Sequence, residues 1–104
     1  MRTYRVVVTD EAMLQMKEYL SYLKNDLANP QAAKSLRDDW KETRESLSVI
    51  AGSIGEPDNE KLVMRNLKKM HFKRHAYVML FRLNGDIVEV VNIYHDLQNY
   101  EQFS

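Results

Sequence analysis

The sequence predicts an α+β domain in which a hairpin of two helices packs on one face of a small, mostly antiparallel sheet. Two apolar stripes of helical spacing, joined by a tight junction, occupy residues 10–52. Two β-prone runs, 77–83 and 87–94, flank Asn84-Gly85, a strong signal for a β-hairpin. The 104 residues suffice for one hydrophobic core, so 1–104 is expected to form a single domain.

The first strand and the first helix are predicted between residues 4 and 27. Residues 4–8 are short and β-branched, which is typical of a strand, here expected at an edge of the sheet. Thr9-Asp10 offers an N-cap, and Asp10 or Glu11 is favourable at the positive end of the helix. Apolar residues then recur at steps of three and four and form one stripe: Met13, Met16, Leu20, Leu23 and Leu27.

The second helix is expected to begin at Asn29-Pro30, with Asn29 as N-cap and Pro30 at the first helical position. Its stripe has the same spacing: Ala33, Leu36, Trp40, Thr43, Leu47 and Ile50. Gly52 is placed to end the helix. Because the junction is short, the two helices should form an antiparallel pair, with Trp40 buried against the sheet.

The second half of the chain completes the order β-α-α-β-β-β. Residues 51–60 are rich in Gly, Pro, Asp and Asn and are expected to form a loop, and 62–72 are expected to form a strand. In the hairpin that follows, Asn84-Gly85 favours a type I′ turn, in which both central residues have positive φ. The polar tail, 96–104, is expected to be a short helical turn or a frayed end.

The composition excludes several kinds of chemistry. Cysteine is absent, which rules out disulfides, thiolate chemistry and cysteine-ligated zinc and fits a reducing cytosol. No apolar run approaches the ~20 residues that span a bilayer, and the N-terminus lacks the apolar segment of a signal peptide. A cytoplasmic protein without membrane association is expected. The three histidines lack other ligands at metal spacing, so neither a metal nor another cofactor is expected.

The net charge is zero, but the charges are unevenly distributed. Residues 1–60 carry eight Lys or Arg against eleven Asp or Glu, whereas residues 61–104 carry seven against four. All seven of those cations lie within 61–83, which has no acidic residue. Such a stretch favours a local anion-binding face. The alternative is an ordinary solvated face, since lysines on an edge strand also block unwanted strand pairing.

Nearly the whole chain resembles the RelE/ParE superfamily, toxins of bacterial type II toxin–antitoxin modules that act in growth arrest and plasmid stabilisation. The resemblance is carried, in chain order, by Tyr4-Arg5-Val6 with Thr9 and Ala12, Asn29-Pro30-Gln31-Ala32-Ala33, Pro57, the aromatic strand 77–83 with Arg82, and the last strand, which ends at His95. The chain departs from the family at Val78 and Asn92, where arginine is common, and in the non-basic run 96–99.

One branch of the family cleaves mRNA, usually on the ribosome. Cleavage by 2′-OH attack needs an acid/base and cations that stabilise the phosphorane. His95 is the best acid/base candidate because imidazole titrates near neutral pH, and Arg82 and Lys69 are the candidates for phosphorane stabilisation. Further contacts to RNA are expected from Lys68, Arg74, His71 and Tyr94. The alternative roles are a strand-capping His95, solvated cations and a tyrosine packed in the core.

The ParE branch instead inhibits DNA gyrase by protein contact and needs no catalytic residues. The missing arginines favour this second function, whereas His95 and the basic stretch favour an endoribonuclease. A degenerate member that serves only as a binding module is a third interpretation. Each active case implies an antitoxin partner, a partly disordered chain that folds around the toxin. An acidic antitoxin segment is expected to cover the basic surface around Lys68, Lys69, Arg74 and Arg82.

Overall fold

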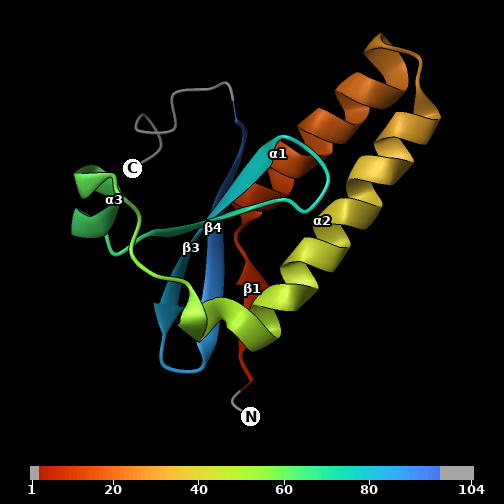
Figure 1. Ribbon diagram of the computed structural model, residues 1–104. Coiled ribbons are helices and arrows are strands. Elements are labelled where there is room, and N and C mark those ends of the chain that lie inside the picture. Colours follow the sequence, from red (N-terminus) through yellow and green to blue (C-terminus); the bar gives the residue numbers. More distant parts are fainter. Residues whose placement is uncertain (1–2, 97–104) are drawn as a thin grey trace.

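The computed structural model describes residues 3–96, so the expectation for the tail falls outside the described residues from 97 onwards. Two long helices lie side by side on one face of a four-stranded sheet, and a third, short helix lies on the other side (Figure 1). The elements follow the order β1 (Arg5–Val8), α1 (Asp10–Ser21), a π-helical turn (Tyr22–Asp26), α2 (Pro30–Ile50), a 3-10 turn (Ala51–Ser53), α3 (Glu60–Met64), β2 (Lys68–His71), β3 (Tyr77–Asn84) and β4 (Ile87–His95). Within residues 3–96, no helix has the length and apolar character needed to cross a bilayer.

The sheet confirms the predicted α+β class. Its strand order is β1-β4-β3-β2, and only the β1–β4 pair is parallel. β1 therefore lies at one edge, as predicted, and β2 lies at the other. The face that α1 and α2 leave uncovered is called the open face below.

Both predicted N-caps are confirmed. The Thr9 side chain accepts a hydrogen bond from Ala12 N at 3.2 Å, and the Asn29 side chain accepts one from Ala32 N at 3.0 Å. Each cap satisfies a backbone donor that the first turn of a helix leaves unpaired. These local bonds explain why both helix starts can be predicted from the sequence.

The first apolar stripe is buried or partly buried, as predicted, except at its last residue, Leu27. Leu27 is 54% exposed, because the last turn of the first helix is π-helical and the Leu27 N–H donates to Tyr22 O, five residues back, at 3.0 Å. A wider turn shifts the following side chains out of phase with the stripe. Ala28 then takes a positive φ of 48°, and the chain reverses into α2.

Gly52 does not act as the predicted helix-ending residue with a left-handed backbone. It lies in the 3-10 turn that follows α2 and is not among the described residues with positive φ. Its lack of a side chain matters for space instead, because a Cβ on Gly52 would overlap the hydroxyl of Tyr4. The glycine therefore lets the residue before β1 pack against the end of α2.

The predicted strand over 62–72 is too long. Asn59 Oδ1 accepts hydrogen bonds from the backbone of Lys61 and Leu62, which starts α3, and only Lys68–His71 forms β2. Asn66 has a positive φ of 56° and turns the chain between the two elements. Leu62 and Leu67, which lie within the predicted strand, are buried, but Leu62 belongs to α3 and Leu67 to the loop that follows it.

The hairpin is confirmed, but the turn type is not. Asn84 pairs with Ile87, so the two central residues of the turn are Gly85 and Asp86. Gly85 has a φ of 58°, and neither Asn84 nor Asp86 has a positive φ. Positive φ at the first central residue alone is the pattern of a type II′ turn. The physical reason is that Asn84 still pairs with β4 as the last residue of β3, so it does not occupy a central position of the turn.

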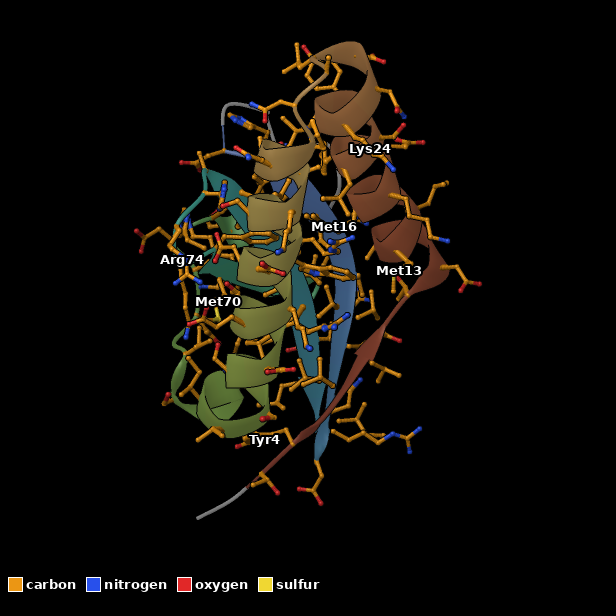
Figure 2. All side chains as sticks on the ribbon, turned by 90° about the vertical axis from the view of Figure 1, so that its right-hand side faces the viewer. Tyr4, Met13, Met16, Lys24, Met70 and Arg74 are labelled. Carbon is orange, nitrogen blue, oxygen red and sulfur yellow. The ribbon has the colours of Figure 1, made fainter. Side chains whose placement is uncertain are left out.

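Two hydrophobic clusters stabilise the sheet. The helix-side cluster packs α1 and α2 on the sheet, and it contains the predicted core residue Trp40, which is 7% exposed. Met16 lies between the two helices in Figure 2 and is fully buried. The smaller open-face cluster lies on the opposite face and consists of Leu62, Leu67, Val78, Leu80 and Tyr94.

Side chains of α1 and of its N-cap residue form hydrogen bonds with β4 beyond the point where β1 ends. β1 pairs with β4 only as far as Val90. Beyond it, Thr9 Oγ1 donates to Val91 O at 3.3 Å, and Gln15 Oε1 accepts from Ile93 N at 2.7 Å. The Tyr19 hydroxyl donates to Ile93 O at 3.1 Å. The second half of β4 is thereby held against α1.

Candidate functional site

The hairpin register separates the two principal site candidates. His95 lies opposite Tyr77, whereas Arg82 lies opposite Glu89. Tyr77 and Arg82 are five residues apart on β3, which corresponds to about 17 Å of strand. Because β3 and β4 are antiparallel, the end of β4, which carries His95, lies beside the start of β3. Arg82 lies near the other end of β3. The expectation that Arg82 and His95 meet at one rim is therefore wrong.

The two residues also lie on opposite faces of the sheet. Residues directly opposite in an antiparallel pair share a face, and Tyr77 packs on the helix-side cluster, so His95 lies on that side. Lys69 and His71 lie opposite Leu80 and Val78 of the open-face cluster. Lys69 and Arg82 thus share the open face with His71, and His95 does not.

His95 packs in a row of aromatic rings. Its ring centroid is 5.1 Å from that of Tyr77, and the Tyr77 centroid is 4.9 Å from that of Tyr19, both in edge-on geometry. Burial raises the pKa of both phenols, and neighbouring phenols add to the rise. Both hydroxyls therefore stay protonated at neutral pH and do not act as bases, and the Tyr19 hydroxyl donates to Ile93 O.

Tyr94, the candidate for stacking on RNA bases, is fully buried within the open-face cluster. Leu62 and Leu67 cover this cluster from α3 and the loop that follows it. The observed position agrees with the alternative role in core packing. A ring in this position has no exposed face to offer a base.

The basic stretch does not form a continuous basic surface. Lys68 Nζ donates to Ile54 O at 2.8 Å. Arg74 forms an ion pair with Glu42 of α2, and Figure 2 shows Arg74 beside that helix. The hydrogen bond from Arg74 lowers the pKa of Glu42, and the reciprocal bond raises the pKa of Arg74. Acidic residues distant in sequence therefore neutralise part of the stretch.

The structure reveals a buried carboxylate that the sequence analysis did not single out. Asp39 of α2 has no exposed surface and accepts hydrogen bonds from the backbone of Lys73 and Arg74 and from Thr43 Oγ1, at 3.0–3.2 Å. His75 Nδ1 lies 2.7 Å from the same carboxylate. Asp39 thus holds the loop 72–76 on α2. The detectable signal was Thr43, a polar residue within the apolar stripe, with Asp39 one turn before it.

Burial by itself raises the pKa of Asp39. The hydrogen bonds from His75, the Arg74 backbone and Thr43 outweigh that effect and hold the pKa below its ordinary value. The carboxylate therefore stays charged at neutral pH. Its role is to fix a loop, since both of its oxygens accept hydrogen bonds.

Arg82 lines a pocket of about 270 Å³ on the open face. Its Nε donates to Arg65 O at 3.2 Å, and its Nη1 lies 3.9 Å from Glu89 Oε1. The side chain of Arg82 is 36% exposed and that of Glu89 is 43% exposed. Over residues 3–96, no group of three His, Asp or Glu side chains could hold a metal ion.

Comparison with known proteins identifies the fold. No family model and no curated protein matches the sequence. A chain from a solved structure described as the chromosomal ParDE TA system from P. aeruginosa matches with a TM-score of 0.74 at 16% identity. The match covers 89% of this chain and 96% of that chain. At this identity the similarity concerns the fold, and it confirms that the chain has the RelE/ParE-like α+β fold predicted from its sequence.

Proposed function

We propose that the protein is the toxin of a type II toxin–antitoxin module and that it arrests growth by binding DNA gyrase, without cleaving RNA. The observation that carries this choice is the separation of the candidate catalytic residues. RNA cleavage needs an acid/base and a phosphate-binding cation on either side of one phosphate. His95 and Arg82 lie on opposite faces and near opposite ends of the hairpin. Inhibition by protein contact requires no such convergence.

The two departures from the family pattern support the same choice. Val78 and Asn92 occupy positions where the family often carries arginine, and both side chains are buried on the open face. An uncharged side chain at these positions cannot neutralise a phosphorane. The shared fold with a chain of a ParDE system adds support for the toxin assignment.

The proposal is tested by expressing the chain from an inducible promoter in a bacterial host, with His95→Ala as the variant. We expect His95→Ala to arrest growth as the unchanged chain does, because a binding inhibitor needs no acid/base. Primer extension on cellular mRNA should find intact transcripts. Purified gyrase should lose supercoiling activity and accumulate DNA cleavage complexes when the chain is added.

A nuclease would behave differently. Loss of its acid/base would lower the cleavage rate by about 10²–10⁴-fold and abolish growth arrest. Cleaved transcripts together with an inactive His95→Ala variant would therefore overturn the gyrase mechanism. Growth arrest with intact transcripts and unaffected gyrase would show that the chain has a target other than gyrase. Circular dichroism of the purified variant controls for loss of the fold.

We also propose that an acidic antitoxin segment binds the open face beside Lys69. Among the cations expected to make this surface, Lys69 lies on the open face opposite Leu80, whereas Lys68 lies opposite Phe81 on the helix side. Lys69→Glu should therefore weaken antitoxin binding, and binding should also weaken with added salt. Lys24→Glu, on the helix side of the molecule, is the matched control. Equal affinities for both variants by titration calorimetry would place the antitoxin elsewhere.

A further inference from the structure

The pocket beside Arg82 has features of a binding site that neither RNA cleavage nor gyrase inhibition explains. Its lining comes from β3 and β4, from the start of α1 and from the segment after α3. The hairpin and two segments distant from it in sequence therefore meet there. Its volume of about 270 Å³ falls just below the range of about 300–1,000 Å³ typical of drug-sized ligands. The site suits a molecule of about the size of an amino acid.

A β-bulge shapes the floor of this pocket. Leu80 pairs with Asn92 and Phe81 with Val90, so Val91 is the extra residue. In a regular strand, Val91 and Asn92 would point to opposite faces. Here both line the pocket. Bulges that re-aim a side chain in this way are over-represented next to functional sites.

Asn92 places a mostly buried polar side chain at the pocket. It is only 6% exposed, and it belongs to the lining. A side-chain amide offers both a hydrogen-bond donor and an acceptor, so Asn92 is suited to receive a polar ligand.

The charges around the pocket specify the ligand. Arg65 and Arg82 contribute two cations, and Glu11 and Glu89 contribute two anions. Within the described part of the chain, neither the Arg65 guanidinium nor the Glu11 carboxylate has a partner, and the Arg82–Glu89 pair is a loose 3.9 Å. A simple anion would be repelled by the glutamates and a simple cation by the arginines. A molecule that carries both charges close together is attracted by all four.

We propose that this pocket binds a free α-amino acid with an aliphatic side chain. Its carboxylate pairs with Arg82 and Arg65, and its ammonium pairs with Glu89 and Glu11. The Asn92 amide supplies a hydrogen bond to the same polar end. The aliphatic group packs on Val91 and Leu67, the apolar side chains of the lining. This inference does not depend on the proposed function.

The test is an NMR titration of the full ¹⁵N-labelled chain with L-leucine. We expect saturable shifts at the backbone amides of 65–67 and 89–92. The probes 4-methylpentanoate, which lacks the ammonium, and 3-methylbutylamine, which lacks the carboxylate, keep the same aliphatic group. Each should bind at least about tenfold more weakly, since each loses one of the two charged groups and the charge-assisted contacts of that group.

Arg82→Gln should weaken L-leucine binding by a similar factor, whereas Lys68→Gln, which changes a lysine on the helix side, should not. Asn92→Ala should also weaken binding. Arg82→Gln keeps the test informative if Asn92→Ala fails to fold, because the Arg82 side chain is partly exposed. Absence of saturable shifts, or equal affinity for L-leucine and either single-charge probe, would overturn the proposal.

Discussion

Replacing Trp40 by alanine is expected to lower the free energy of unfolding by about 3–5 kcal/mol, the cost of a large cavity in a packed core. Trp40 lies in the helix-side cluster, where α2 meets the sheet. The guanidinium carbon of Arg44 lies 4.3 Å from the centre of the indole ring, and this contact is lost as well. Urea unfolding followed by far-UV circular dichroism measures the effect, with a lower midpoint at an unchanged slope.

Trp40→Phe is the matched variant. The indole Nε1 is buried and has no hydrogen-bond partner among the described residues, so phenylalanine removes no hydrogen bond. The loss should then be only about 1–2 kcal/mol, because most of the ring volume remains. Equal losses for alanine and phenylalanine would contradict the assignment of Trp40 to volume filling, since they would indicate a polar role for the indole.

Asp39→Ala is expected to lower the free energy of unfolding by about 3 kcal/mol. The change removes the acceptor for the Lys73 and Arg74 backbone N–H groups and for the His75 ring. Each donor left buried without an acceptor is costly, and the loop 72–76 loses its attachment to α2. Asp39→Asn should cost less, because an amide oxygen can still accept from one of these donors.

Glu42→Ala is the control for Asp39→Ala. Glu42 lies one turn further along α2 and also has two cationic partners, Arg74 and Lys73, but it is exposed. Exposed ion pairs contribute little, so this variant should unfold close to the unchanged chain. A loss as large as that of Asp39→Ala would mean that charge pairing, not burial of the acceptor, holds the loop.

The lowered pKa of Asp39 also predicts a dependence on pH. A carboxyl whose pKa is lower in the folded state stabilises the fold above its unfolded pKa of about 4, and this stabilisation is lost as the pH falls through the folded value. The unchanged chain should therefore lose stability below about pH 4 more steeply than Asp39→Asn. Denaturant unfolding at several pH values measures the difference, and parallel curves would exclude Asp39 as the group responsible.

The sequence by itself determined the two long helices, the first strand and the hairpin, and it missed α3. Thr9 and Asn29 start helices through hydrogen bonds that span three residues, and the apolar stripes pack these helices on one face. The two β-prone runs form a hairpin around Gly85. Each of these features depends on residues near one another in the chain, so its signal is visible in a short window of sequence.

Only the tertiary structure decided which of the candidate site residues meet. The hairpin register and the bulge at Val91 set the face and the position of Arg82, Asn92 and His95. The basic stretch has no acid within it, yet Glu42 and Asp39 reach it from a helix more than thirty residues earlier. A charge takes its partner from whatever the packing brings within hydrogen-bond distance, and that neighbour is not written in the local sequence.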